Sequence, residues 1–469
     1  MVVGVLFRDG VSTAPTFDIL EVNRRNIVKA FFNVPSAEGI KEIMKSERFS
    51  KAEYLLLLSL IAFTFIPSIN QLIVDRFITD IGGNVLEIAG QIEWFDLFNE
   101  TILAFLTVPL YFVFNRAKND DEFSSRINTT FVIGFVLYAL ISTVIYFYAS
   151  TLTAYMNAPA ESVNYLCLET IGFVIGFISS YLFVVFVVRG KKEIFVSLLL
   201  VKVAMLSIGN AVLIPQYGVT GVAMTNISVN LMISIISIML LYREKLLRRW
   251  GGINKPAIAD WVKTGLFSGG TVFVANLIYV LIVMKMVNEV SQMSNYWLAN
   301  NFIWGWLIIP VAAIGEMMKR EYYNGYRRIW NYIALTTLVL IIWFMSVPLW
   351  DFMFREIIRC EDPSAITGIL YMSVPFYVFY AYSVIIQAVL ISVGKTRYIF
   401  YECLFVNFVY YGIVYGLYLA GVFEASLEFI ILMFGIGLAV CLVIDLAFYL
   451  YSMKDIPKEY LAKDAALTE

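Results

Sequence analysis

The sequence contains no histidine, few cysteines and little charge. Without histidine the chain lacks the side chain that ordinarily titrates near neutral pH and the commonest metal ligand, so any proton chemistry falls to carboxylates. The four cysteines lie far apart, without the spacing of a metal site or of a paired disulfide framework: Cys167, Cys360, Cys403 and Cys441. We interpret them as apolar fillers.

Charged residues make up only 15% of the chain, against about 25% in soluble domains, whereas 60% of its residues are hydrophobic. The net charge of -2 is too small to indicate a nucleic-acid partner. What the chain has in abundance is long apolar runs. A hydrocarbon core of roughly 30 Å needs about 20 apolar helical residues, because every backbone N–H and C=O must be satisfied within the segment. The sequence therefore predicts an all-α, polytopic membrane protein.

Twelve apolar runs of this length predict 12 transmembrane helices. In the first half of the chain the predicted spans are residues 53–81, 95–114, 129–148, 165–188, 194–214 and 219–242. In the second half they are residues 265–287, 296–314, 329–349, 366–393, 398–419 and 427–451.

Basic residues gather in the loops that follow the even-numbered spans, among them Arg116, Lys118, Arg189, Lys191, Arg243, Lys319 and Lys395. The loops on the opposite side hold little beyond Arg76, Arg355 and Arg359. By the positive-inside rule, both termini are predicted to face the cytoplasm. We also expect the protein to be a monomer in the plasma membrane.

Internal similarity divides the chain into two halves of six spans each. Residues 165–203 repeat the layout of residues 371–407, with a Gly-Lys turn in each, and residues 87–94 resemble residues 297–304. We expect one bundle at 51–242, a cytoplasmic linker at 243–257, a second bundle at 258–453 and a cytoplasmic tail at 454–469. Residues 1–50 are predicted to form an amphipathic segment on the inner membrane face, the alternative being a loosely ordered tail.

Acidic residues at membrane depth are concentrated in the first half of the chain. An ionisable residue there costs at least about 2.5 to 3.5 kcal/mol, so it normally faces protein or water and often has a function. Glu93, Asp96 and Glu100 fall on one face of a helix with about 3.6 residues per turn. Asp75 and Glu169 are predicted at a similar depth. Such a crowded set is suited to binding and releasing a proton. The alternative is that these residues are exposed at helix ends in water.

Several segments resemble the multidrug and toxin extrusion (MATE) transporters. They are Asp75-Arg76-Phe77-Ile78-Thr79-Asp80-Ile81-Gly82-Gly83, Asn157-Ala158-Pro159-Ala160, the two Gly-Lys turns and Tyr217-Gly218-Val219-Thr220-Gly221-Val222-Ala223. The resemblance extends over nearly all of residues 51–454. It implies two pseudo-symmetric six-helix bundles around a central cleft that opens alternately to either side. It also implies export of organic, often cationic, compounds against an inward flow of protons or sodium ions.

In this resemblance Asp75 falls on the first-helix aspartate implicated in cation coupling, and Asn210 and Asn226 fall on polar positions around it. The acidic position of the fifth helix is Ile214 here, which favours a proton over sodium, because a bare sodium ion prefers a cage of several oxygens. We therefore expect no cofactor or metal beyond the coupling ion. The expected coupling residues are Asp75, Glu93, Asp96, Glu169, Asn210 and Asn226. The expected substrate cleft contains Glu100, Asn276, Asn300, Asn301, Trp304 and Gln387.

Other ionisable residues within the spans are given simpler interpretations. Lys202 and Lys285 are expected to be snorkelling or paired cations, and Glu402 and Asp445 to be interfacial. The family's acidic positions in the seventh and tenth helices are absent, so coupling through the second bundle is not expected.

Two other functions remain as alternatives to the export of a small organic substrate. A flippase for a lipid-linked oligosaccharide would call for basic residues in the cleft, but acidic residues outnumber basic ones at depth. A membrane-embedded transferase would need metal-binding carboxylates. Asp120-Asp121-Glu122 is the only compact candidate, and we interpret it as a solvated charge run. We therefore do not expect an enzyme.

Overall fold

The computed structural model describes residues 49–244, 252–323 and 329–452. The predicted tail at 454–469 and nearly all of the predicted amphipathic segment at 1–50 lie outside the described residues, as does the middle of the predicted linker, 245–251. Within the described ranges every regular element is a helix. The prediction of an all-α membrane protein with 12 membrane-length helices is confirmed.

Residues 49–244 form eight helices. They are α3 (Lys51–Ile81), α4 (Gly83–Gly90), α5 (Ile92–Asn115), α6 (Asp120–Phe147), α7 (Ala149–Tyr155), α8 (Ser162–Val188), α9 (Lys192–Tyr217) and α10 (Val219–Arg243). The short α4 leads into α5 as one membrane-length helix, and the short α7 follows α6.

The second half contains several helices interrupted by π-helical turns (η). Its elements are α11 (Lys255–Ile278), η2 (Tyr279–Met284), α12 (Lys285–Glu289), α13 (Met293–Phe302), η3 (Ile303–Leu307), α14 (Ile308–Tyr323), α15 (Ile329–Phe352), η4 (Met353–Ile358), α16 (Pro363–Ser392), α17 (Thr396–Leu404), η5 (Phe405–Tyr411), α18 (Gly412–Leu419) and α19 (Leu427–Ser452).

Polar residues in the loops determine where several of these helices begin. Ser50 and Glu53 form a capping box at the start of α3, so two of the unpaired backbone donors of the first turn are satisfied. The Asn119 side chain accepts a bond from the Glu122 N–H at the start of α6, at 2.8 Å. At the other end of α3, Gly82 has a φ of 64°, a conformation that glycine adopts without strain.

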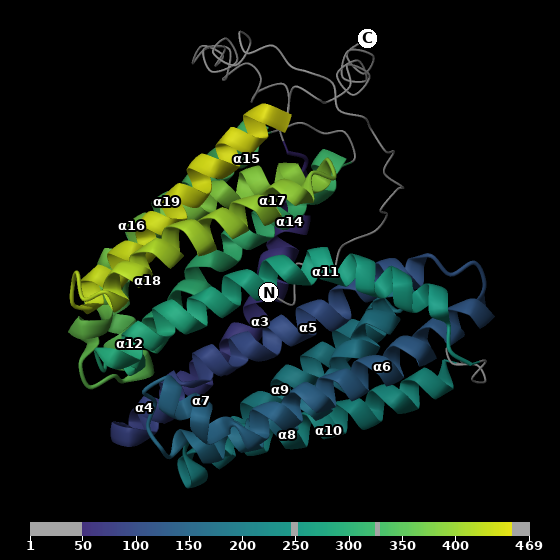
Figure 1. Cartoon of the computed structure of the whole chain (residues 1–469), viewed down its shortest axis with the longest axis horizontal. Coiled ribbons are helices and arrows are strands. Elements are labelled where there is room, and N and C mark those ends of the chain that lie inside the picture. The colour runs from purple at the N-terminus through teal and green to yellow at the C-terminus, as the bar shows by residue number, and fades with distance from the viewer. Residues whose placement is uncertain (1–48, 245–251, 324–328, 453–469) are drawn as a thin grey trace.

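The helices form two bundles, α3–α10 and α11–α19, which Figure 1 shows in purple to teal and in teal to yellow. We call these the first and second bundle. The side on which α3 begins and α10 and α19 end is called the terminal side, and the opposite side the far side. The terminal side is the one predicted to be cytoplasmic.

The first helix of the first bundle crosses to the other bundle at its terminal end. Leu57 and Leu60 of α3 are buried in one apolar cluster with Ala313, Ile314 and Met317 of α14. The same helix also packs against α9 of its own bundle, and it keeps contacts with the second bundle as far as Thr79. Burial of these apolar side chains against the second bundle stabilises the crossing.

The first helix of the second bundle makes the reciprocal crossing, and Figure 1 shows α11 running between the two bundles. Trp261 near its start donates from Nε1 to the carbonyl oxygen of Leu106 in α5, at 2.9 Å. At Gly269 a Cβ would lie 2.5 Å from the Phe105 ring, so only glycine allows this close approach. Beyond it, Tyr279 contacts Tyr296 of α13 at 2.9 Å between hydroxyl oxygens. We call α3 and α11 the crossing helices.

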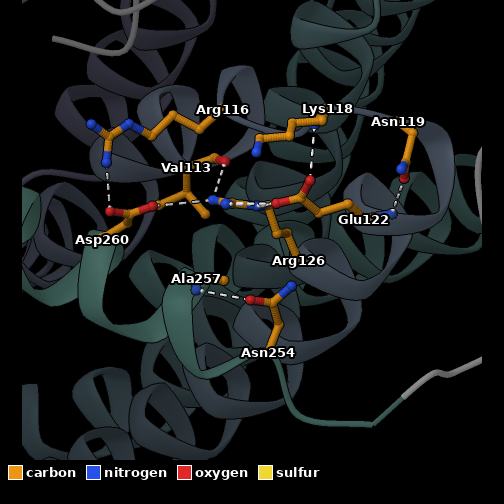
Figure 2. Close-up of polar contacts among 9 residues, drawn as sticks. All are labelled: Val113, Arg116, Lys118, Asn119, Glu122, Arg126, Asn254, Ala257 and Asp260. Carbon is orange, nitrogen blue, oxygen red and sulfur yellow. Dashed lines mark hydrogen bonds and ion pairs between the residues drawn. The ribbon is translucent and has the colours of Figure 1, made fainter. Parts of the chain in front are cut away.

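Ion pairs fix the start of α11 on the first bundle, as Figure 2 shows. Asp260 accepts from Arg116 at 2.7 Å and from Arg126 at 3.2 Å. The Arg126 side chain is only 6% exposed, and it also pairs with Glu122 at 2.9 Å and donates to the Val113 carbonyl oxygen at 3.0 Å. A buried guanidinium requires such partners, because an unpaired buried charge is costly. Glu122, predicted to belong to a solvated charge run, is therefore part of a structural ion-pair network.

Candidate functional site

Asp75 lies in the far half of α3 and is buried, at 5% exposure. Its Oδ1 accepts a hydrogen bond from Gln71, one turn earlier on the same helix, at 2.9 Å. The same oxygen accepts a second bond from Asn301 of α13, also at 2.9 Å. The alternative of an exposed helix end is therefore not what the structure shows for Asp75. One carboxylate oxygen joins the first bundle to the second.

Glu93 in the first turn of α5 makes a parallel connection. Its Oε1 accepts a bond from the side-chain amide of Asn300, at 2.5 Å. Asn300 and Asn301 are consecutive, so neighbouring amides of α13 reach two acidic residues on two helices of the first bundle. We call these two contacts the carboxylate–amide bridges.

Glu169 on α8 is fully buried inside the first bundle. Its Oε1 accepts bonds from Asn226 of α10 at 2.7 Å and from the Tyr165 hydroxyl at 3.2 Å. Its other oxygen, Oε2, is buried and has no hydrogen-bond partner. An unsatisfied buried carboxylate oxygen is costly, so this group is suited to carrying a proton or facing a cation.

Asp96 and Glu100 complete the acidic set on α5. Asp96 is exposed, and it interacts electrostatically with Glu169, Glu93 and Glu100. Glu100 is partly buried, with an Oε1 that has no hydrogen-bond partner. The predicted helical stripe is therefore present, and its middle member is the one open to solvent.

The remaining expected residues lie at different distances from this set. Asn210 of α9 is buried and donates to Asn70 of α3, at 3.1 Å. Asn276 of α11 donates to the Thr101 hydroxyl of α5 at 3.1 Å, and Trp304 makes an edge contact with the Tyr380 ring at 5.4 Å. Gln387 lies apart from Asn300 and Asn301, inside the second bundle beside Asp445.

Sequence reasoning missed several polar residues that hold the site in place. Gln71 lies four residues before Asp75, a helical spacing that could have revealed it. Asn70 and Tyr165 also contact expected site residues. Nothing in the local sequence around Asn288 indicates that it exchanges two amide hydrogen bonds with Gln91, at 2.9 and 3.1 Å.

The bundles are joined on the far side by further contacts, which we call the far-side contacts. They include the Gln91–Asn288 pair, the bond from the Thr79 hydroxyl to the Ile358 carbonyl oxygen at 2.5 Å, and close packing of Gly90 on Met293. A Cβ at Gly90 would lie 3.1 Å from the Met293 backbone. These contacts close the molecule on that side of the carboxylate–amide bridges.

Basic side chains contribute little to the site. Among the residues that the structure describes, no lysine or arginine pairs with Asp75, Glu93, Asp96, Glu100 or Glu169. Lys285 is a paired cation, as expected, with Glu289 at 3.2 Å. Lys202 of α9 forms no ion pair within the described ranges. An acidic set facing neutral amides can hold protons or an organic cation.

The fold and the site together define a polytopic helical membrane protein of two bundles with an acidic centre between them. No protein-family model matches the sequence, and no curated protein matches it. The fold, however, is that of the MATE transporters. A multidrug resistance MATE family transporter of the MOP superfamily, in an inward-facing conformation, is similar with a TM-score of 0.70 and 13% identity, covering 86% of this chain and 99% of that one.

Two other solved structures are similar over the same extent. An outward-facing multidrug resistance MATE family transporter has a TM-score of 0.57 at 13% identity, covering 87% of this chain and 99% of that one. A MOP superfamily transporter from Pyrococcus furiosus has a TM-score of 0.59 at 14% identity, with the same coverage.

Proposed function

We propose that this protein is a secondary active transporter that exports organic cationic or amphipathic compounds by alternating access, in exchange for protons. The observation that carries the proposal is the pair of carboxylate–amide bridges. Asp75 and Glu93 of the first bundle accept bonds from Asn301 and Asn300 of the second. The charge of the acidic set therefore acts directly on the contact between the two bundles.

The conformation described here corresponds to the inward-facing state of this cycle. Two observations support this assignment: the far-side contacts join the bundles on one side, and the TM-score is higher to the inward-facing neighbour than to the outward-facing one, at 0.70 against 0.57. In this assignment the terminal side faces the cytoplasm, in agreement with the distribution of basic loops.

Ion occupancy biases the cycle through the strength of the bridges. A hydrogen bond to an ionised carboxylate is roughly twice as strong as one between neutral groups. Deprotonated Asp75 and Glu93 therefore hold the far side closed. A proton or an organic cation that neutralises them weakens the bridges and favours separation of the bundles there. A proton fits better than sodium because amide N–H donors already occupy Asp75 Oδ1 and Glu93 Oε1, which leaves fewer oxygens for a sodium ion.

Proteoliposomes test this proposal directly. With a lipophilic organic cation as substrate, we expect substrate-driven proton movement in the parent protein and its loss in Asp75→Asn. Asp80→Asn is the matched control, because Asp80 lies on the same helix in an exposed pair with Arg76. Equal coupling in the parent and in Asp75→Asn removes Asp75 from the mechanism. Transport that follows a sodium gradient and ignores a pH gradient contradicts proton exchange.

One observation favours flipping of a lipid-linked oligosaccharide as a second candidate function. Lys202 lies within α9, and no carboxylate of the described residues pairs with it. A lipid diphosphate would offer it a partner. Flipping of a lipid-linked diphosphate that is lost in Lys202→Gln, together with no transport of organic cations, would establish this second function in place of the first.

A further inference from the structure

A second group of buried polar side chains lies inside the second bundle, away from the carboxylate–amide bridges. Asp445 of α19 is fully buried and Glu402 of α17 is 5% exposed. The interpretation of both residues as interfacial is therefore wrong. Distance along the helix gives the position of each residue, and Asp445 lies roughly 10 Å from the end of α19. It could not indicate that both side chains point into the bundle.

Asp445 has one satisfied oxygen and one free oxygen. Oδ2 accepts bonds from Ser383 and, at 2.9 Å, from Gln387, both on α16. Oδ1 is buried and has no hydrogen-bond partner. A buried carboxylate oxygen without a donor is costly, so this atom points to a ligand that the contacts within the protein do not supply.

Glu402 lies on the neighbouring helix and interacts electrostatically with Asp445. Cys441, which lies one turn before Asp445 on α19, interacts electrostatically with Glu402. Cys403 and Tyr398 of α17 and Tyr410 and Tyr411 of η5 also face α19. On the adjoining α12, Lys285 and Glu289 pair with each other.

The negative charge of the two carboxyl groups is not neutralised by a basic side chain among the residues that the structure describes. Within the described ranges neither Asp445 nor Glu402 forms an ion pair with a lysine or arginine. Two neighbouring buried carboxylates without a cation are strongly unfavourable, and such pairs hold a proton between them.

The donors around Asp445 favour a proton over a metal ion. The Ser383 hydroxyl and the Gln387 amide direct hydrogens at Oδ2, which removes that oxygen from a cation's shell. No group of three histidine, cysteine, aspartate or glutamate residues in the described part of the chain is placed to hold a metal. Sodium prefers several oxygens, whereas a proton needs only the free Oδ1 of Asp445.

We propose that Asp445 and Glu402 form a second proton-binding site, in which the two carboxyl groups share one proton. The site joins α16, α17 and α19, so its occupancy affects the packing of the second bundle alone. The evidence for the site comes from contacts within that bundle. Only its part in a transport cycle rests on the proposed function, to which it adds a proton bound outside the acidic set of the first bundle.

Infrared difference spectroscopy tests the site without any transport measurement. The full-length protein is reconstituted in liposomes, and spectra are recorded across a pH series. We expect a protonated-carboxyl band near neutral pH in the parent, and loss of one component of that band in both Asp445→Asn and Glu402→Gln. Each substitution leaves a single carboxyl group, which no longer needs to share a proton. The same component is expected to persist in Asp75→Asn.

Cys441 provides an internal reporter and a matched control. Its S–H band is expected to shift at the same pH as the carboxyl component, because the thiol interacts electrostatically with the Glu402 carboxyl group. Cys441→Ala is expected to remove the S–H signal and keep the carboxyl component. Because Asp445→Asn can disturb folding, Glu402→Gln is the second, independent variant, and both are checked by thermal unfolding.

Two results overturn the proposal. One is a carboxyl band that is unchanged in both Asp445→Asn and Glu402→Gln. The other is disappearance of the carboxyl-band component from the parent spectrum when sodium is added at constant pH, which would assign the site to a metal ion. Neither result affects the outcome for Asp75→Asn in the transport assay, so the two proposals fail separately.

Discussion

At the scale of single residues, the main feature is that one carboxylate oxygen of Asp75 accepts two hydrogen bonds, one within its own helix and one from the other bundle. Oδ1 accepts from Gln71 within α3 and from Asn301 across the bundles. The first bond orients the side chain, and the second transmits its charge state to the other bundle. The two donors can be removed one at a time.

We predict that Asn301→Ala opens the far side and that Gln71→Ala does not. Loss of a hydrogen bond to a charged group costs about 1.5 to 3 kcal/mol, which corresponds to a change of at least about tenfold in the conformational equilibrium. The measurement is labelling of Thr79→Cys by a membrane-impermeant thiol reagent, in a background without the four native cysteines. Equal labelling rates in the two variants would show that the cross-bundle bond does not hold this side closed.

The sequence could identify the acidic residues of the site but not their partners. Asp75 and Glu169 stand out because an ionisable group at membrane depth is expensive. The bond between Asp75 and Asn301 joins residues 226 positions apart, so no local pattern predicts it. Depth along a helix also says nothing about the direction of a side chain. The sequence therefore predicts an interfacial Asp445, whereas the structure buries its side chain inside the second bundle.

At the scale of secondary-structure elements, the start of α11 shows how a polar segment can belong to a membrane helix. The predicted span begins at residue 265, whereas α11 begins at Lys255. Asp260 and Lys263 lower the hydropathy of this first part, yet Trp261 is buried against α5. Hydropathy therefore predicts the apolar part of the helix and misses the turns that dock on the first bundle.

We predict that Asp260→Asn destabilises the protein more than Arg116→Gln. Asp260 is a partner of the buried Arg126, and its loss leaves that guanidinium with Glu122 as its remaining ion-pair partner, at a cost of about 1 to 3 kcal/mol. The value is below that of a fully buried pair because Asp260 is 21% exposed. Arg116 is 49% exposed, so its pair is worth less than about 1 kcal/mol.

Thermal unfolding in detergent measures this difference. A lower midpoint is expected for Asp260→Asn, and a midpoint close to that of the parent for Arg116→Gln. Equal midpoints for the two variants would mean that the network in Figure 2 does not anchor α11.

At the scale of the whole molecule, the two bundles touch in two different ways. On the far side they meet through polar bonds, such as the Gln91–Asn288 pair, and through an apolar cluster that includes Ile78 and Trp94 of the first bundle and Trp297 of the second. On the terminal side each bundle contains the beginning of the other's first helix, held by apolar burial and ion pairs. The two sides therefore differ in their polar contacts, which are neutral amides on the far side and ion pairs on the terminal side.

We predict that a short cross-link between cysteines at Gln91→Cys and Asn288→Cys stops transport. It would keep the far side closed, and transport should return when a reducible cross-linker is cleaved. Lys191→Cys with Glu244→Cys is the control, because this ion pair joins the ends of α9 and α10 within the first bundle. Undiminished transport with the Gln91–Asn288 cross-link in place would exclude opening on that side.

The number of spans could be predicted from the sequence, because a bilayer imposes a length on every helix. The crossing of α3 and α11 could not be predicted. It depends on which face of each helix packs on which neighbour, and residues such as Leu57 and Ala313 are apolar whether they meet lipid or protein.

The exchange of first helices between the bundles has a consequence for the origin and assembly of the chain. It is the arrangement that a domain-swapped homodimer would leave after its two copies were fused. Neither half completes its own surface, so each half acts as a template for the other. Fusion through a short connection then turns the encounter of two subunits into an intramolecular step at high effective concentration.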